Sequence, residues 1–413
     1  MQRDATPNAR DGDPRQHVVV AGGGILGCLT SLLLAECGRA VTLVDAGREL
    51  WRGASAAGEG KVHLGLVYSL GSPDSRQSML RAALDFGPLV ERAVGRRVDW
   101  PALTSDPFDY LVMPDSLASA EELAAVYRSL DDEHSRLGRP PYLGLDLDRI
   151  AAGRAQADPT GLPVFATAER AVDPDRLRAI VVDAIERRAP AVRVISGSRV
   201  TAVDQRESGV RVHLDGDESA PLTAAAMVDA RWAWQGFGVQ GVRARRRNLR
   251  VKSAAILPAG AGERTVTLVV GPYGDVVPRA DSVYVSWYPE ARRAHEHRAH
   301  PSSRALAALA QATVRGSAHD SSQRQCDALA ELGLVDHGVE PIALRAGLIV
   351  GDGAADIDSP RSGLHDRRGF GSRVVGRVVL PRSLKFSTAP RAATQAVSAV
   401  LPLLGAPAPE FAS

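Results

Sequence analysis

The spacing of apolar residues near the N-terminus predicts a β-α-β unit. Residues 18–20 form a continuous valine run typical of a buried strand, and residues 25–37 form a leucine-rich segment long enough for a buried helix. A second apolar run, 40–44, predicts another strand, and it ends in Asp45. Between the first strand and the helix the chain reads AGGGILG, which places glycines at 22, 24 and 27 in the spacing G-x-G-x-x-G.

Each part of this unit has a physical role in binding an adenine dinucleotide. Gly22 permits a tight turn, Gly24 lets a pyrophosphate approach the backbone, and Gly27 lets the helix pack closely on the strand. The helix N-terminus offers unpaired amides and a partial positive charge to the phosphates. Asp45 is placed to accept hydrogen bonds from ribose hydroxyls. The unit therefore predicts a dinucleotide site and leaves open which dinucleotide binds.

Beyond residue 45, strand-rich and helical patterns alternate along the chain. A glycine- and serine-rich stretch follows at 47–75, and loops of this length are usually functional. Helices are predicted over 76–86, where Gly87-Pro88 breaks the pattern, over 119–137, from the N-cap Asp173 onward, within 301–334 and over 388–404. Strands are predicted over 109–113, 224–230, 239–289 (several short ones), 343–350 and 374–380.

This order predicts an α/β protein with two interleaved domains. A phosphate-binding unit comes first, a strand-rich insertion follows, and strand plus helix return at the end, a layout that favours FAD over a nicotinamide cofactor. A disordered tail is expected over 1–16. The predicted ranges are 17–95, 155–238 and 340–413 for a discontinuous FAD-binding domain, and 96–154 and 239–339 for a substrate domain.

Composition is that of an ordinary soluble globular protein. The chain has 413 residues, of which 45% are hydrophobic and 24% charged, with a formal net charge of +2. No apolar run approaches the roughly 20 residues that a membrane helix needs, and the polar N-terminus lacks the core of a signal peptide, so a cytoplasmic location is expected. Cys28, Cys37 and Cys326 lack metal-ligand spacing and are expected to be core thiols.

Lysine is rare in this chain and therefore informative. Of 50 basic residues only Lys61, Lys252 and Lys385 are lysines, and all others are arginines. A background preference for arginine explains most of these positions. Where arginine is the default, each remaining lysine is a candidate for a site that needs a compact ammonium with a shiftable pKa.

Together these motifs resemble the FAD-dependent oxidoreductases of the D-amino-acid oxidase and glycine oxidase family, from about residue 17 to 404. The resemblance rests on the glycine motif with Asp45, on GASAAGEGKVHLG, TAERAVDPDRL and MVDARWAW, and on LKFSTAPRAA. It implies a Rossmann-like FAD-binding domain of the glutathione-reductase type with an inserted antiparallel-sheet substrate domain. The segments GEGKVHLG and SVYVSWYP suggest a little-studied branch of that family.

The resemblance also implies a set of cofactor contacts. They are Gly22, Gly24, Gly27, Asp45, Ser55, Val200, Ala230 and the segment around Thr388, with Lys385 expected over the flavin edge or the phosphates. Two departures stand out, because Arg231 follows Ala230 where the family usually has glycine, and SLKFS replaces a glycine-rich turn. Thr388 as N-cap and Pro390 in the first turn would aim helix amides at negative charge on the flavin.

The family reaction implies oxidation of a C–N bond by hydride transfer to flavin N5. His63 is a candidate to line the site or to handle protons, and Lys61 and Lys252 are candidates to assist electron transfer to oxygen, the expected acceptor. Arg345 is the candidate for binding a substrate carboxylate, although an ion pair with a neighbouring acid explains it equally well. Tyr284, Trp287 and Tyr288 could wall the pocket. The substrate could be an amino acid, an amine or an amino-sugar-like metabolite of a biosynthetic pathway, and C–O oxidation stays open.

Two sequence features suggest functions other than C–N oxidation. A basic cluster makes an FAD-dependent tRNA-modifying enzyme an alternative; it consists of Arg243, Arg245, Arg246, Arg247 and Arg250. No aromatic residues alternate with these arginines, so we expect a solvated surface and no binding of nucleic acid. A flavin-bound non-catalytic partner protein is a further alternative. HEHRAH contains three histidines without a recognised ligand spacing, and no metal is expected. The oligomeric state cannot be read from the sequence.

Overall fold

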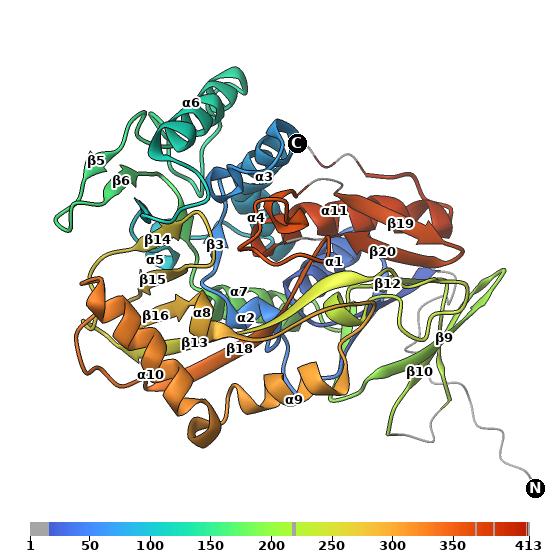
Figure 1. The fold of residues 1–413 in the computed structure, drawn as a ribbon. Helices are drawn as coiled ribbons and strands as arrows, with labels where there is room; N and C mark the ends of the chain where they lie inside the picture. The colour runs from blue at the N-terminus through green and yellow to red at the C-terminus, as the bar shows by residue number, and fades with distance from the viewer. Residues whose placement is uncertain (1–15, 217–219, 368–369, 383–384, 410, 412–413) are drawn as a thin grey trace, which may run out of the picture.

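The computed structural model describes residues 16–216, 220–367, 370–382, 385–409 and 411. The tail predicted for residues 1–16 lies outside this range except for its last residue. Within the described residues, no helix is both long enough and apolar enough to cross a membrane. Two sheets, with helices packed around them, make up most of the molecule (Figure 1).

The predicted β-α-β unit forms the centre of a six-stranded sheet. β1 (His17–Ala21) and β2 (Ala40–Asp45) are parallel neighbours, and α1 (Ile25–Glu36) connects them. The strand order is β19-β20-β12-β1-β2-β8, with β19 antiparallel to β20 and the other pairs parallel. The other strands of this sheet are β8 (Val192–Ser196), β12 (Ala226–Asp229), β19 (Gly371–Val375) and β20 (Val378–Arg382). This arrangement is the Rossmann-like sheet that the sequence predicted.

Two local predictions are wrong in detail. The strand predicted over 374–380 is a hairpin, because Gly376, at φ +56°, turns the chain between β19 and β20. The helix break predicted at Gly87-Pro88 falls earlier, since α3 (Pro73–Leu84) ends before Asp85 and α4 (Phe86–Val94) follows. Pro88 is tolerated in the first turn of α4 because amides there have no partner within the helix.

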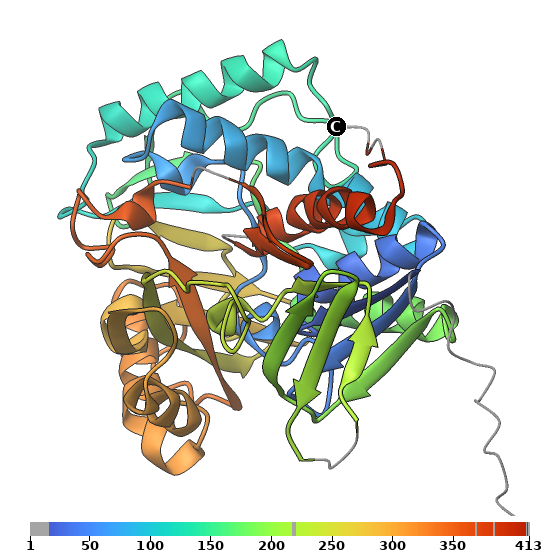
Figure 2. The ribbon, with the colours of Figure 1, turned by 90° about the vertical axis from the view of Figure 1, so that its right-hand side faces the viewer.

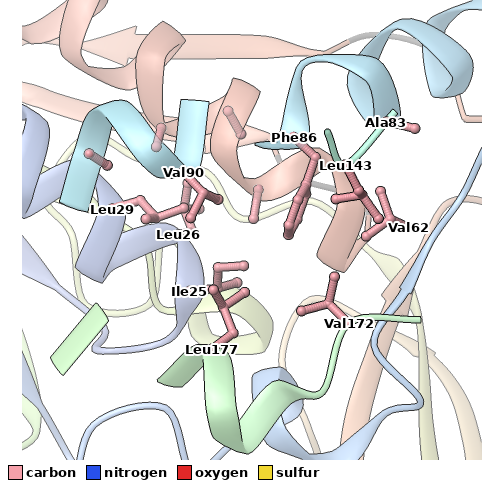
Figure 3. Close-up of a cluster of buried hydrophobic side chains, with 14 of the residues drawn as sticks. Ile25, Leu26, Leu29, Val62, Ala83, Phe86, Val90, Leu143, Val172 and Leu177 are labelled. Atoms are coloured by element: carbon pink, nitrogen blue, oxygen red, sulfur yellow. The ribbon is translucent and has the colours of Figure 1, made fainter. Parts of the chain in front are cut away.

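Helix α1 is the centre of the largest apolar core. It packs against α4, α7 (Pro174–Arg187) and α11 (Ala389–Val400). Figure 3 shows Ile25, Leu26 and Leu29 of α1 facing side chains of the helices around it, with Phe86 and Val90 on α4. Burying these side chains against one another fixes the N-terminal end of α1, where the phosphates of a dinucleotide would bind.

The larger sheet carries the second half of the site. Its order is β17-β13-β16-β15-β14-β4-β6-β5, and β18 also pairs with β13. Pairs are antiparallel except β14 with β4. The strands are β4 (Asp109–Val112), β5 (Gln156–Ala157), β6 (Pro163–Ala166), β13 (Arg247–Pro258), β14 (Val266–Val269), β15 (Gly274–Pro278), β16 (Ser282–Trp287), β17 (Arg292–Arg298) and β18 (Ala343–Gly351).

Strand membership refines the predicted domain ranges. β5, β6 and β18 lie within ranges predicted for the FAD-binding domain, yet all three belong to the larger sheet. The sequence of each strand does not show to which sheet it belongs, because that depends on pairing with strands far away in the chain. The domain boundaries themselves stay a prediction.

Helices and smaller sheets complete the fold. α8 (Tyr288–Ala291), α9 (Ser303–Gln311) and α10 (Arg315–Glu331) pack on the larger sheet, while α6 (Ala120–Arg136) packs against α3. A three-stranded sheet of β9 (Val200–Arg206), β10 (Gly209–Leu214) and β11 (Leu222–Ala224) stands beside the six-stranded one (Figure 2). The remaining elements are α2 (Ala54–Ala57), α5 (Trp100–Leu103) and the antiparallel pair β3 (Lys61–Val62) and β7 (Arg170–Ala171).

A contact between α2 and strand β18 of the larger sheet positions the site. α2 lies against β18, so that a Cβ at Gly347 would come within 2.8 Å of the Ala57 Cβ. The chain then runs from α2 into β3. The glycine-rich stretch predicted to be a functional loop therefore lies where the nucleotide-binding sheet meets the larger sheet.

Candidate active site

The glycine turn after β1 is packed as a dinucleotide site requires. Gly22 has φ +105°, and a Cβ there would lie 2.6 Å from the Ala230 carbonyl oxygen. A Cβ on Gly27 would lie 1.7 Å from the Gly22 carbonyl oxygen, and one on Gly24 would lie 2.9 Å from Ser55 Oγ. No larger residue fits at Gly22 or Gly27 without moving the backbone. At Gly24 the nearest atom is a side-chain oxygen and not backbone, and this is where a pyrophosphate is expected to approach.

Asp45 and Ser55 hold this turn in place. Asp45 accepts hydrogen bonds from the backbone amides of Gly23 at 2.5 Å and Gly47 at 2.7 Å. Ser55 Oγ accepts one from the Ile25 amide, in the first turn of α1, at 3.0 Å. Their predicted contacts with the cofactor stay predictions, and the structure adds that both residues shape the crevice themselves.

Val200 and Ala230 lie beside the carboxyl end of β1. The Ala230 amide donates to the Ala21 carbonyl at 2.8 Å, and the Val200 carbonyl accepts from Arg231 at 3.2 Å. Arg231 replaces the glycine that the resemblance leads one to expect. Its guanidinium pairs with the fully buried Asp229 at 2.8 Å, so the substitution is accommodated by a salt bridge.

Thr388 and Lys385 come just before α11. Thr388 occupies the N-cap position, but its side chain does not cap the helix, because Oγ1 accepts from the Lys385 amide and donates to the Lys385 carbonyl. Thr388 therefore holds the predicted N-cap position without a side-chain cap. The backbone amides of the first turn remain free to face a ligand, and Pro390 lies in that turn as predicted.

A cavity of about 200 Å³ lies over the larger sheet, beside α2 and β3, and brings together residues from distant parts of the sequence. Lys61, His63, Lys252 and Lys385, four of the residues singled out in the sequence, all line it. Tyr284 and Tyr288 also line it, whereas Trp287 packs into the core on the opposite face of β16. Three lysines, the only ones in the chain, thus meet in one cavity.

Lys61 is a buried ammonium with a complete set of partners. Its Nζ lies 2.6 Å from Asp275 Oδ1 and also donates to Thr267 Oγ1, on neighbouring strands of the larger sheet. The Phe108 ring centroid lies 4.0 Å away, within cation–π distance. Although burial alone would raise the pKa of Asp275, the ammoniums of Lys61 and Lys252 hold it well below its usual value. The pair is therefore ionised.

His63 is held beside a fully buried carboxylate. Its Nδ1 lies 3.4 Å from Glu169 Oε1, and Glu169 also accepts from the Tyr110 hydroxyl at 2.5 Å and the Leu64 amide at 2.6 Å. Burial lowers the pKa of His63 more than Glu169 raises it, so the imidazole is neutral near pH 7. The pKa of Glu169 is lowered because His63 and Lys61 outweigh the effect of its burial.

Arg345 does not line the cavity. Its guanidinium donates to the Ala56 carbonyl at 2.8 Å and pairs with Asp175, which ties α2 to α7. The sequence left open an ion pair with a neighbouring acid, and that is the contact seen. Arg345 is therefore not placed to bind a ligand in this cavity.

Two other arginines, Arg250 and Arg367, do line the cavity, and sequence reasoning missed both. Arg250 was placed on a solvated basic face, yet it is 4% exposed and lines the cavity. Its alternation with Lys252 on β13 was a usable signal, because residues two apart on a strand share a face. Arg367 is 2% exposed and also lines the cavity, and nothing in its local sequence distinguishes it.

Comparisons with known proteins agree with this geometry. The chain resembles the solved structures of L-amino acid deaminase from Proteus vulgaris (TM-score 0.62, 14% identity, covering 99% of this chain and 97% of that one). It also resembles glycine oxidase from Geobacillus kaustophilus (TM-score 0.60, 15% identity, 93% and 95% covered). A third neighbour is L-alpha-glycerophosphate oxidase from Mycoplasma pneumoniae with FAD bound (TM-score 0.61, 15% identity, 96% and 97% covered). At these identities the likeness shows the fold.

Sequence comparison settles the family. None of the curated proteins matches the chain. A family model, however, described as FAD dependent oxidoreductase, matches residues 17–330 of the 413. The fold class and the resemblance expected from the sequence are thereby confirmed. The chain belongs to the DAO family of FAD dependent oxidoreductases, and FAD is its cofactor.

Proposed function

We propose that this enzyme oxidises a C–N bond of an amino acid, an amine or an amino-sugar-like metabolite, with oxygen as the final acceptor. The observation that carries the proposal is the cavity in which a neutral histidine and three lysines meet next to a dinucleotide crevice. The tRNA alternative loses support, because Arg247 and Arg250 of the basic cluster are engaged inside the protein. We retain the cytoplasm as the proposed location.

The residues present fit FAD. The glycine turn leaves no room for a Cβ at Gly22 or Gly27, and the amides at the start of α1 face the same crevice. The first turn of α11 supplies a second set of amides for negative charge near the flavin ring. When bound, FAD supplies the hydride acceptor of the reaction.

His63 is suited to take the proton that an ammonium substrate must lose. A C–N oxidation of this kind needs the amine in its neutral form, with its C–H bond aimed at the acceptor. His63 is neutral, lines the cavity and has an ionised carboxylate at Nδ1, so Glu169 stabilises the imidazolium that forms. Glu169 is a positioning residue in this scheme, since it does not line the cavity.

Lys252 and Lys61 are suited to favour negative charge in the cavity. Lys252 presents its ammonium from β13, on the face that lines the cavity. A fixed cation at this place stabilises the negative charge that oxygen gains when it accepts an electron. We therefore keep oxygen as the proposed acceptor.

Anaerobic bleaching of the holoenzyme tests the reaction class. Panels of amino acids, amines and the corresponding alcohols are mixed with the enzyme, and the visible absorbance of the flavin is followed. We expect amino acids or amines to bleach the flavin and the corresponding alcohols not to. Bleaching by alcohols alone would assign C–O oxidation, and no bleaching at all would favour the non-catalytic alternative.

Two variants test the proton step. His63→Asn should slow bleaching roughly 10²–10⁴-fold, the usual range for a general base. Because Glu169 raises the pKa of His63, Glu169→Gln should move the acidic limb of the bleaching rate to lower pH. Glu133→Gln is the matched control, since Glu133, on α6, is also buried but pairs with Arg81 of α3 and Arg136 of α6. A limb that stays in place in Glu169→Gln would refute this role.

A further inference from the structure

A second hollow, which we call the side pocket, has a volume of about 100 Å³. It is formed by the segment that follows α5, by β7 with the start of α7, and by the turn after β15. Ala102 and Ala280 in its lining are exposed, whereas Leu103, Ala171 and Val277 are buried. The side pocket therefore runs inward from the surface and ends on small apolar side chains.

The side pocket and the cavity are neighbours along β15. Asp275 lines the cavity, and Val277, two residues further along the strand, lines the side pocket. Residues two apart on a strand share a face. Tyr284 of β16 lies directly opposite Val277 and lines the cavity. The two hollows are therefore adjacent over the same face of the larger sheet.

The partition between the two hollows also includes the strand pair of β3 and β7. Lys61 of β3 lines the cavity, and Ala171, its direct partner on β7, lines the side pocket. The backbone here is tightly packed, since a Cβ added at Gly60 would lie 2.0 Å from the Val172 carbonyl oxygen. A passage between the hollows can therefore form only where side chains make up the partition.

Arg279 and Tyr284 are the side chains at that place. Arg279 lines the side pocket, and its guanidinium donates to the Glu59 carbonyl at 3.2 Å and lies 5.6 Å from the centroid of the Tyr284 ring. Glu59 and Tyr284 line the cavity on the other side. Neither contact of the guanidinium is an ion pair. The side chain of Arg279 can therefore swing outward at modest cost and open the partition.

The chemistry of the side pocket suits a small uncharged molecule. Two guanidiniums, those of Arg176 and Arg279, line it together with one carboxylate, that of Asp173. The excess of positive charge repels an ammonium substrate but does not act on molecular oxygen. The apolar inner end favours oxygen over charged solutes. Lys61, which we propose to favour the negative charge that oxygen gains, lies just across the partition.

We propose that the side pocket is the entrance through which oxygen reaches the cavity, and that Arg279 and Tyr284 form its inner gate. This inference rests on the proposed function and deepens its oxygen step. Oxygen takes up two electrons and two protons as the reduced FAD is reoxidised, and it leaves as hydrogen peroxide. A separate entrance lets oxygen arrive while the organic product still occupies the cavity.

Reoxidation in the absence of substrate tests the entrance. The holoenzyme is reduced with a stoichiometric amount of dithionite under nitrogen and mixed with oxygenated buffer, and the returning flavin absorbance gives a second-order rate constant. Ala280→Trp narrows the exposed mouth and should lower this constant about tenfold or more. Ala307→Trp is the matched control, since Ala307 is exposed on α9 and lines neither hollow. Equal constants in Ala280→Trp and the unmodified enzyme would overturn the proposal.

Two further variants test the inner end and the gate. Val277→Phe fills the inner end of the side pocket and should slow reoxidation as Ala280→Trp does, with Tm showing that the variant is folded. Arg279→Ala removes one side of the gate and should raise the rate constant. An unchanged or lower constant in Arg279→Ala would refute the gate.

Xenon gives a readout that does not depend on the reaction of the cofactor. It binds in small apolar hollows, and crystals of the holoenzyme under xenon pressure show where it binds. We expect a xenon atom beside Leu103, Ala171 and Val277 in the unmodified protein and none there in Val277→Phe. Absence of xenon from the side pocket of the unmodified protein would overturn the proposal.

Anaerobic bleaching separates this inference from the proposed function. Bleaching by an amine does not involve oxygen, so Ala280→Trp should leave its rate unchanged. An equal loss in bleaching and in reoxidation would mean that the side pocket is not an oxygen entrance. Reoxidation of the unmodified enzyme no faster than that of free reduced FAD would overturn both oxygen as acceptor and the entrance, and would leave C–N oxidation standing.

Discussion

The nucleotide crevice and the cavity differ in the parts of the chain that form them. The nucleotide crevice consists of backbone, because glycines 22, 24 and 27, their amides and the end of α1 define it within a few consecutive residues. The cavity consists of charged side chains from β3, β13, β15 and the segments before α11. In the crevice, the glycines at 22 and 27 pack directly against backbone atoms. In the cavity, buried donors are left without partners.

This difference separates what the fold requires from what the ligand requires. A glycine turn is needed for the protein to pack at all, since larger residues would collide with backbone atoms. An excess of buried cations opposes folding and is tolerated only where it serves binding. The cavity is therefore expected to determine the substrate, and the crevice to determine only that a dinucleotide binds.

Gly27→Ala should have the largest effect of any single change at the crevice. Its Cβ would lie 1.7 Å from the Gly22 carbonyl oxygen, and because that atom is backbone no side chain can move aside to relieve the collision. We expect a loss of more than about 3 kcal/mol of stability together with loss of bound flavin, at the upper end of overpacking effects. Absorbance at the flavin band and thermal unfolding measure both.

Gly53→Ala is the control for this change. Gly53 comes just before α2, has φ −81° and has no atom within 4 Å of an added Cβ. It should leave flavin content and Tm nearly unchanged. If Gly27→Ala also purified yellow and stable, the steric account of the crevice would be wrong.

The crevice could be predicted from the sequence because its parts are contiguous. Strand, glycine turn, helix and Asp45 follow one another within 29 residues, His17 to Asp45, and each is required by local geometry. The same holds for the Asp173 cap of α7, which was predicted and is present. The hairpin at Gly376 was missed, because a short loop between two apolar runs looks like one strand when read alone.

Most of the cavity could not be predicted in this way. Glu169, Asp275 and Arg367 come from three segments far apart in the chain, and each looks like an ordinary surface charge in its local sequence. The lysines were found only because arginine dominates everywhere else. Arg345 was misplaced because a strand arginine can face either a ligand or a neighbouring helix, and only tertiary packing decides which.

Lys61→Met probes the paired part of the cavity. It would leave Asp275 buried without its ammonium partner, and breaking a buried pair from one side costs about 3–5 kcal/mol. Arg187→Met is the surface control, because its pair with Asp183 is exposed and is expected to contribute less than about 1 kcal/mol. Chemical denaturation measures both. Equal losses would contradict the distinction between cavity and surface pairs.

The same pair predicts a pH dependence of stability. The pKa of Asp275 is lowered in the folded state, so its contribution is fully present above the unfolded pKa near 3.8 and is lost as pH falls below it. Lys61→Met removes a main cause of that lowering. Its stability should therefore fall less steeply below pH 4 than that of the unmodified protein, and denaturation series at pH 3 to 6 would show whether the slopes differ.

The smallest expected effect concerns Lys385 and the charge of the cavity. Burial and the neighbouring Arg367 lower the pKa of Lys385 to about 7, while Glu59 opposes them and Arg250 and Lys252 add to them. Below that pH the ammonium favours an anion, and above it the neutral amine does not. A bound anion favours the protonated form, so the affinity of the holoenzyme for a carboxylate such as glutarate, followed by the shift of the flavin spectrum, should decline from about pH 7 upward, by at most tenfold per pH unit.

Lys385→Arg and Lys385→Met sharpen this expectation. The arginine stays charged, so glutarate affinity should be flat between pH 7 and 9, and the methionine should give affinity that is equally flat but weaker. His63 adds nothing in this range, because burial keeps its pKa below the usual 6.5. A decline of affinity that persists in both variants would show that a group other than Lys385 titrates.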